Sequence, residues 1–400
     1  MNSFYNLGIA PGILTVLDNN KFTVPTAIQE QAIPLAIQGK DIVGVAQTGT
    51  GKTLAFAIPM IQFLAQKKGI GLILAPTREL ALQIEEVYAW IGRPFAIKTA
   101  CLIGGASMHN QTLALHKKPG VLIATPGRLI DHLHRRHLSL KDVMMLVLDE
   151  ADRMLDLGFA PQIEKILSTL PTKRQTLIFS ATIPPAIIGM ASQYMKLPIS
   201  VEIAPSGTAA ECVTQEVFIV KKEDKMMILS KLLSQYAGSV LLFSRTKHNA
   251  RKIARRIRDL GYSAAEIHSN RTLSQRREAL KGFKSGKYRI LVATDIAARG
   301  LDVTGIEVVI NYDLPDDTEN YVHRIGRTGR AGSRGHAISL ATPEQRRNVQ
   351  AIEELIRATL PISQHPAMPS EQFHKPQPVH WPGRSRYCGK SFRRFRKRRR

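Results

Sequence analysis

The chain has 400 residues, of which 44% are hydrophobic, so it is long enough for two domains that each bury a core. Lys and Arg total 56 against 32 Asp and Glu, and the resulting net charge of +24 exceeds what solubility alone requires. Such a balance favours a polyanionic partner, because clustered cations bind phosphates and release their counterions.

The N-terminus and the cysteines exclude several other classes of protein. Residues 1–10 lack a basic segment followed by an apolar run, so no signal peptide is expected. Cys101, Cys212 and Cys388 lie far apart and form no CxxC pair, which argues against a disulfide framework and a zinc site. Because no uninterrupted apolar run reaches membrane-spanning length, about 18 residues, we expect a soluble cytoplasmic protein with no membrane partner.

Short apolar runs rich in Val, Ile and Leu recur along the chain. They predict strands at Ile42–Val45, Leu72–Ala75, Val121–Ala124, Met144–Leu148, Thr176–Phe179, Val240–Phe243, Ile290–Ala293, Val308–Ile310 and Ala337–Leu340. The runs do not alternate with polar residues, which is typical of strands buried on both faces. Helical periodicity lies between them, as at Arg78–Trp90, Ala160–Leu170 and His248–Leu260. This alternation predicts an α/β fold with parallel sheets, whose ligands bind beyond the carboxyl ends of the strands.

Changes in composition predict the domain boundaries. We expect a first domain at 1–204, a linker at 205–214 where small residues replace the apolar periodicity, and a second domain at 215–360. Residues 361–400 hold six prolines and then ten basic residues within 384–400, so a disordered basic tail is expected. Aromatic side chains among these arginines favour an RNA tether, with a non-specific basic tail as the alternative.

A phosphate-binding loop is predicted directly after the first strand. The sequence there is Ala46, Gln47, Thr48, Gly49, Thr50, Gly51, Lys52 and Thr53, which fits G-x-x-x-x-G-K-[ST] except for Ala46 at the first glycine. Glycines let backbone N–H groups point at the phosphates of ATP, while Lys52 neutralises charge and Thr53 ligates Mg²⁺. The alternative is an ordinary glycine-rich turn.

An acidic cluster follows another strand. Asp149, Glu150 and Asp152 lie within four residues at the end of Met144–Leu148, and carboxylates so close repel one another unless a cation is near. The chemical interpretation is that Asp149 holds Mg²⁺ through water and that Glu150 polarises the attacking water. A solvated acidic turn is the alternative.

With these two elements the chain resembles a DEAD-box ATP-dependent RNA helicase of superfamily 2, over about residues 4–345. The resemblance implies two tandem RecA-like domains, ATP as substrate, Mg²⁺ as cofactor and RNA as partner. The short extensions suggest the bacterial type that acts in ribosome assembly or RNA turnover, on ribosomal or messenger RNA, with RNA-processing or ribosome-assembly proteins as further partners.

The resemblance also assigns nucleotide and RNA contacts in the first half. FTVPTAIQ at 22–29 is similar to the adenine motif, so Phe22 would stack on the base and Gln29 would pair with its edge. Motifs similar to the RNA-contacting ones supply Arg78, Gly105, Thr125 and Arg128, which would bind sugar and phosphate without reading sequence. Taken singly, Phe22 could be a core aromatic and each RNA motif an ordinary turn.

Coupling of ATP hydrolysis to unwinding is implied by SAT at 180–182. Ser180 and Thr182 would bond Asp152, and His323 would join this network. A local helix cap is the alternative for SAT.

The second half resembles the family in two further motifs. Thr294 would contact RNA and Asp302 the ATP ribose, while Arg327 and Arg330 would stabilise the transferring phosphate as arginine fingers. One family motif departs from its pattern: with Arg276 aligned for RNA phosphate, Leu273 stands where Gln is common.

Because neither half carries every candidate group, closure of the halves is expected to assemble the site, so that ATP and RNA help each other bind. The predicted function is RNA-stimulated ATP hydrolysis coupled to local unwinding of short RNA duplexes and RNP remodelling. The alternatives are an ATP-gated RNA clamp or assembly scaffold, and a DNA translocase.

Overall fold

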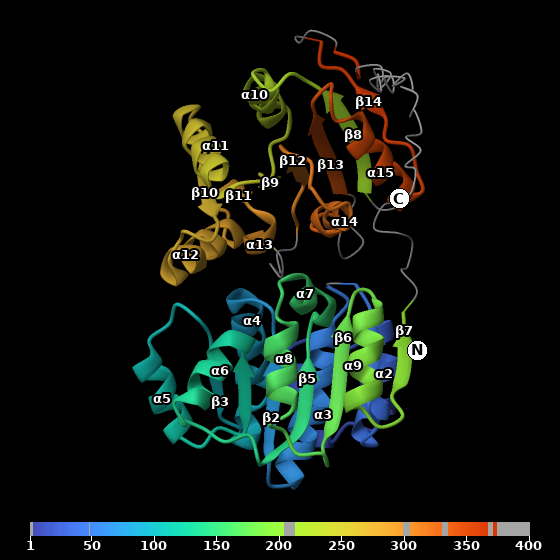
Figure 1. Cartoon of the computed structure of the whole chain (residues 1–400), viewed down its shortest axis with the longest axis vertical. Helices are drawn as coiled ribbons and strands as arrows, with labels where there is room; N and C mark the ends of the chain where they lie inside the picture. The colour runs from blue at the N-terminus through green and yellow to red at the C-terminus, as the bar shows by residue number, and fades with distance from the viewer. Residues whose placement is uncertain are drawn as a thin grey trace, which may run out of the picture.

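The structure is a computed structural model that describes residues 3–47, 49–203, 213–298, 305–329, 335–366 and 371–373. Thr48, Asp302 and Arg330 lie outside the described residues, as do most of the predicted linker and tail. Two α/β halves follow one another along the chain, and the loops of one face the other (Figure 1).

The first half is built on a seven-stranded sheet in the order β3-β4-β2-β5-β6-β1-β7, and every strand pair is parallel. Its strands are β1 (Ile42–Val45), β2 (Ile70–Leu74), β3 (Thr99–Leu102), β4 (Val121–Ala124), β5 (Val143–Leu148), β6 (Gln175–Ser180) and β7 (Ile199–Glu202).

The second half repeats this topology. Its seven-stranded sheet has the order β10-β11-β9-β12-β13-β8-β14, which is the first order with each number raised by seven, and its pairs are also parallel. The strands are β8 (Val213–Ile219), β9 (Val240–Phe243), β10 (Ala264–Ile267), β11 (Ile290–Ala293), β12 (Val308–Asn311), β13 (Gly335–Ala341) and β14 (Ile362–Ser363).

Helices cover both faces of each sheet. In the first half they are α1 (Pro11–Asn19), α2 (Ala27–Ile37), α3 (Lys52–Gln66), α4 (Arg78–Ile91), α5 (Met108–His116), α6 (Pro126–His134), α7 (Ala151–Asp156), α8 (Ala160–Leu167) and α9 (Pro185–Tyr194). In the second they are α10 (Lys225–Gln235), α11 (Lys247–Asp259), α12 (Leu273–Lys284), α13 (Asp295–Ala298), α14 (Glu319–Ile325) and α15 (Arg346–Ile356). Short 3-10 helices lie at Phe4–Asn6 and Arg93–Phe95.

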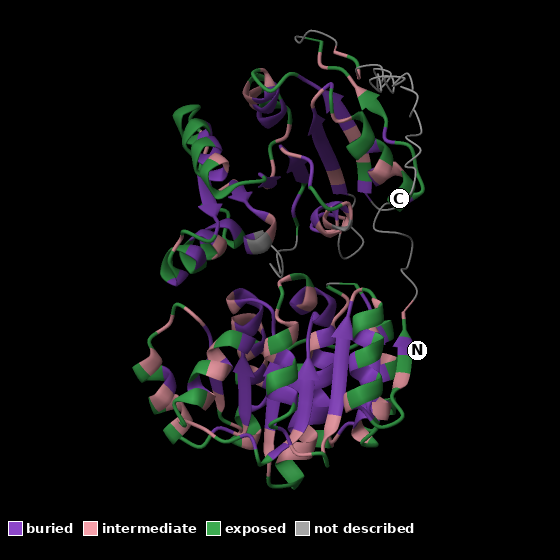
Figure 2. Cartoon of the chain, in the orientation of Figure 1, coloured by how far each residue is buried: buried purple, intermediate pink, exposed green. Residues whose placement is uncertain are grey.

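The core of the first half lies on both sides of its sheet. Successive residues of one strand enter different clusters: Ile42 packs with the helices of one face and Val43 with those of the other. The inner strands β4, β2, β5, β6 and β1 are accordingly buried along most of their length, whereas the edge strands β3 and β7 are only partly buried (Figure 2). The expected fold class, parallel α/β sheets flanked by helices and repeated in tandem, is confirmed.

All nine predicted strands match to within two residues at each end, but β3, β7, β8, β10 and β14 were not predicted. Their sequences explain this, since TACL and AAEI, for example, contain Thr, small Ala or a charged Glu instead of a branched apolar run. β8 begins at Val213, which lies inside the predicted linker. β14 lies inside the predicted tail and pairs with β8. Within the described residues no helix is long and apolar enough to span a membrane.

Candidate active site

The predicted phosphate loop joins β1 to α3. Gly49 and Gly51 have φ angles of 90° and 89°, a left-handed conformation that glycine adopts without strain. Lys52 is the first residue of α3, and its buried ammonium group donates a hydrogen bond to the carbonyl of Ala46 at 2.8 Å. The loop therefore curls around its own lysine at the N-terminus of a helix, where backbone N–H groups and the helix dipole favour a phosphate.

Gln29 connects the expected adenine motif to this loop. Its side-chain oxygen accepts from the N–H of Thr26 at 3.0 Å in a capping box, and its amide donates to the carbonyl of Gly51 at 3.0 Å. A Cβ atom at Gly51 would collide with the Gln29 amide. The residue expected to read the base is thus bonded to the loop expected to hold the phosphates.

Phe22 stacks on Trp90 of α4, with ring centroids 5.5 Å apart and planes 1° from parallel. The Phe22 side chain is still 39% exposed, so it belongs to the surface and not to the core. Sequence reasoning missed Trp90, because the two residues are distant in the chain and no local motif pairs them. Trp90 fixes the ring that would stack on adenine.

The acidic cluster lies at the carboxyl end of β5. Asp149 and Glu150 are 2% and 6% exposed. Burial raises the pKa of Asp149 to about 7, against the opposing charge of Lys52 and with further repulsion from Glu150. The carboxyl group of Asp149 also accepts a hydrogen bond from the backbone N–H of Glu150 at 3.0 Å.

The pKa of Glu150 is lowered, in contrast to that of Asp149. Glu150 has a φ of 51°, uncommon for a non-glycine residue, and its carboxylate forms an ion pair with the guanidinium of Arg153. Burial by itself would raise the pKa of Glu150, but Arg153, Lys52 and the more distant Arg327 lower it overall. Arg153 is a second residue that motif reasoning missed, although its spacing three residues after Glu150 on a helix permits the contact.

Asp152 is hydrogen-bonded to the SAT segment, residues 180–182. One carboxylate oxygen of Asp152 accepts from the N–H of Ala181 at 3.0 Å, from the N–H of Thr182 at 2.9 Å and from the Thr182 hydroxyl at 3.1 Å. The backbone N–H of Asp152 donates to the Ser180 hydroxyl at 3.1 Å. These bonds tie the end of β6 to α7, so a shift of either element moves the other.

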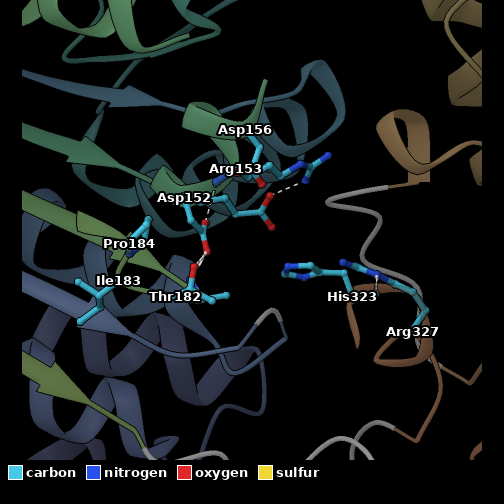
Figure 3. A pocket seen from close by; sticks show the side chains of 10 residues that line it. Asp152, Arg153, Asp156, Thr182, Ile183, Pro184, His323 and Arg327 are labelled. Carbon is cyan, nitrogen blue, oxygen red and sulfur yellow. Dashed lines mark hydrogen bonds and ion pairs between the residues drawn. The ribbon is translucent and has the colours of Figure 1, made fainter. Parts of the chain in front are cut away.

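A cavity of about 380 Å³ opens between the halves beside this network. Its lining joins residues from both: Glu150, Asp152, Arg153, Asp156, Ala181, Thr182, Ile183, Pro184, His323 and Arg327. Figure 3 shows His323 and Arg327 directed from the second half toward Asp152 and Thr182. His323 therefore lines the same cavity as Asp152 and Thr182, and its place in their network stays a prediction.

Arg324, between these two residues, is directed into the second half. Its guanidinium is 2% exposed, forms two hydrogen bonds with Asp295 at 2.6 and 2.8 Å, and donates to Asn311 at 3.1 Å. It therefore joins the start of α13 to α14. The sequence motifs assign no role to Arg324, yet its bonds orient the helix that carries His323.

The first-half residues expected at RNA gather at the carboxyl ends of β2, β3 and β4. The guanidinium of Arg78 lies over the turn at Gly105, where any Cβ would collide with it. Arg128 donates to the carbonyl of Ala106 at 3.1 Å. Thr125 follows β4, and Thr294 follows β11 in the second half.

Arg276 and Leu273 of α12 contact the first half. The Arg276 guanidinium pairs with the Glu79 carboxylate of α4 at 2.8 Å, and both side chains are largely buried. Leu273 packs in the apolar cluster of the first half. Where the family commonly has Gln, this chain thus has an apolar contact between its halves.

These groups can perform phosphoryl transfer between the halves. A helix N-terminus and a lysine can hold phosphates, a carboxylate of lowered pKa can accept a proton or orient a water, and an arginine approaches from the other half. Only a closed arrangement brings these groups together.

Comparisons with known proteins agree with this chemistry. The DEAD/DEAH box helicase family matches residues 26–188, and the helicase conserved C-terminal domain matches 224–332. The ATP-dependent rRNA helicase RRP3 of Debaryomyces hansenii is 44% identical over 91% of this chain and 77% of its own length. RRP3 of Candida albicans is 44% identical over 91% of this chain and 69% of its own length.

Solved structures agree with the fold. S. cerevisiae Dbp5 bound to RNA and ADP BeF3 superposes with a TM-score of 0.81 at 30% identity, over 90% of this chain and 96% of its own. A DEAD box protein from Methanococcus jannaschii is 37% identical with a TM-score of 0.54, over 91% of this chain and 99% of its own. The chain therefore belongs to the DEAD-box family of ATP-dependent RNA helicases.

Proposed function

We propose that this helicase acts on ribosomal RNA and opens short duplexes each time its two halves close and reopen around ATP. The observation that carries the proposal is the cavity lined by Glu150, Asp152 and Thr182 from the first half and by His323 and Arg327 from the second. Because the cavity needs both halves, the nucleotide and RNA would favour the same closed state.

Within the ATP site, Phe22 and Gln29 would hold adenine, and the loop ending in Lys52 and Thr53 would hold the phosphates. Glu150 would orient and deprotonate the attacking water, since its lowered pKa keeps it ionised at neutral pH. Arg327 would stabilise charge on the transferring phosphate. Corresponding roles for Arg330 and for Asp302 at the ribose remain predictions from the motifs.

Mg²⁺ fits the donors present. Thr53 is the second residue of α3 and Asp149 directly follows β5, and burial of the Asp149 carboxyl raises its pKa to about 7. A hard cation with oxygen ligands would stabilise this carboxylate in its charged form. When bound, Mg²⁺ would neutralise phosphate charge, and Thr53 and Asp149 would orient it, the latter through water.

On the RNA side, Arg78, Gly105, Thr125 and Arg128 would bind the backbone of one strand from the first half, and Thr294 from the second. Arg276 would join them only if its bond to Glu79 rearranges. The Asp152 network would transmit the state of the nucleotide to this face, because Thr182 and His323 border the same cavity.

Ribosomal RNA as substrate is supported by the fungal relatives, which are named rRNA helicases. The expectation of a bacterial type has no support from these relatives. A cytoplasmic location and partner proteins of RNA processing or ribosome assembly remain predictions from the sequence.

The clamp remains a second candidate function. Arg276, Glu79 and Leu273 join the halves by a buried ion pair and an apolar contact, which would favour long-lived closure. A clamp would release RNA more slowly than it hydrolyses the first ATP, whereas a helicase would displace strands and turn over repeatedly.

The test measures ATP turnover and strand displacement by the full chain with ribosomal RNA duplexes, and with DNA of the same sequence. RNA should raise turnover at least several-fold and DNA should not, because the 2′-hydroxyl distinguishes them. Crosslinking in cells with sequencing of the bound RNA identifies the substrate. Turnover indifferent to RNA, or crosslinks that avoid ribosomal RNA, would contradict the proposal.

A further inference from the structure

The amino ends of the first sheet's strands form an edge opposite to the one that carries the phosphate loop and the acidic cluster. In Figure 1 this edge points away from the second half. A hollow of about 1160 Å³ lies along the starts of β3, β4, β2 and β5, and one of about 330 Å³ lies by β6, β1 and β7. The hollows share Gln66, Lys67 and Met144, so they form one continuous track, which we call the rear track.

Basic side chains dominate the rear track. Its lining contains Lys67, Lys68, Lys98, Lys117, Lys118, Lys141, Lys173, Arg174 and Lys196, with Asp142 as its acidic side chain. The eight lysines are exposed, and among the described residues none of their ammonium groups takes part in an ion pair. They are available to a ligand.

The charge is concentrated on this edge and does not reflect a generally basic surface. Residues 1–203 contain nineteen Lys and Arg against fourteen Asp and Glu. The rear track takes nine of these basic residues and one of the acidic ones, so the remainder of the first half is net negative. Separation of charge within one domain directs a polyanion to one edge.

The shape of the rear track suits a nucleic-acid backbone. Phe95, Ile97, Leu115 and Leu138 are half-buried between the lysines of the larger hollow and offer apolar surface to sugars or bases. Seven strands about 4.8 Å apart give an edge of roughly 30 Å, enough for several nucleotides. An acidic protein would also be attracted, but the family's substrate is present at high local concentration whenever the helicase is engaged.

We propose that the rear track is a second RNA-binding surface, which holds the phosphate backbone of RNA that flanks the segment gripped between the halves. It binds without ATP and without reading sequence, since lysines contact phosphates and not base edges. It keeps the enzyme on a long RNA while the ATP-dependent face opens and closes.

The test uses the full chain with Lys68→Glu, Lys98→Glu and Lys141→Glu combined. Affinity is measured with a non-hydrolysable ATP analogue for single-stranded RNAs of about 10 and about 40 nucleotides, the shorter filling only the front site. Affinity for the long RNA should fall at least about tenfold near 0.1 M salt, and the slope of log affinity against log salt should fall by about 2. Affinity for the short RNA should not change.

The matched control replaces three exposed lysines of the second half, Lys222→Glu, Lys231→Glu and Lys252→Glu, with the same change in net charge. A milder variant, Lys68→Gln, Lys98→Gln and Lys141→Gln, guards against a folding defect and should give a smaller loss on long RNA. The proposal is overturned if the rear-track variant binds the long RNA with unchanged affinity, which is the result expected of a site for an acidic protein. It is also overturned if the control variant loses as much affinity for the long RNA.

Discussion

Arg276 of α12 and Glu79 of α4 form an ion pair of 2.8 Å between the two halves, with both side chains largely buried. Arg276 was expected at RNA phosphate, and Glu79 lies beside Arg78 in the motif expected at RNA. The pair therefore occupies the junction where closure and RNA binding meet. Breaking a buried pair leaves one charge without its partner, at a cost of about 3–5 kcal/mol if the site stays closed.

Arg276→Ala should shift the protein toward its open state. We expect a roughly tenfold or greater fall in the closed population, because the unpaired Glu79 carboxylate is solvated by water only when the halves open. Energy transfer between dyes on the two halves measures this, with an ATP analogue and no RNA. Glu79→Gln should also reduce the closed population. In the variant that carries both substitutions, the free energy of closure should be lost by less than the sum of the two single losses. Additive effects would show that the pair does not stabilise closure.

Leu273→Gln restores the residue common in the family and should also weaken closure. Leu273 packs in the apolar cluster of the first half, and burial of a leucine is worth about 1.5–3 kcal/mol. We expect at least a fivefold loss of the closed population in the same measurement. Leu273→Met, which conserves apolar volume, is the control and should change little. Closure unaffected by Gln would mean that the contact is incidental.

Much of the fold and part of the candidate site could be predicted because their signals are local. β1, the loop through Lys52 and the start of α3 form one continuous segment, in which glycine and lysine spacing encodes the turn. β5 and the carboxylates after it are another. Such segments carry their own geometry, since the loop begins where a buried strand ends.

The remainder depends on contacts between distant segments. Phe22 meets Trp90, Glu79 meets Arg276, and Asp295 meets Arg324 only after the sheets form. No period or spacing in the chain encodes these pairs. The unpredicted strand β10 has the same origin, because AAEI is stabilised by its neighbours in the sheet and not by its own β-propensity.

Glu150→Gln should nearly abolish ATP turnover, by about 10²–10⁴-fold, because the amide cannot accept a proton from water. Nucleotide binding should persist within a few-fold, since the phosphate loop is unchanged. Steady-state turnover and fluorescent-nucleotide titration separate the two quantities. Asp156→Asn, a carboxylate that lines the same cavity, is the matched control and should retain most of the activity. Equal losses of ATP turnover in both variants would contradict the role of Glu150 as the general base.

Thr182→Ala should separate ATP hydrolysis from unwinding. The variant loses the hydroxyl bond to Asp152 but keeps both backbone N–H bonds to that carboxylate, so the network is weakened and not lost. ATP turnover should stay within about threefold, while the rate of duplex opening falls about tenfold or more, as expected for a coupling of roughly 1–3 kcal/mol. A fluorescent duplex reports opening beside a phosphate-release assay. A proportional fall of both rates would place Thr182 in catalysis.

Gln29→Ala should relax the choice of base and also loosen the phosphate loop. Its amide binds the Gly51 carbonyl at 3.0 Å, so its loss removes a bond to the loop as well as the expected pairing with adenine. We expect the preference for ATP over GTP in kcat/KM to fall by about 10–100-fold, because a hydrogen-bonding site discriminates through groups left without partners. Gln29→Glu tests the geometry separately: it keeps the shape and the acceptor for Thr26 but cannot donate to Gly51 when ionised. If this variant retains the full preference for ATP, the amide does not read the base.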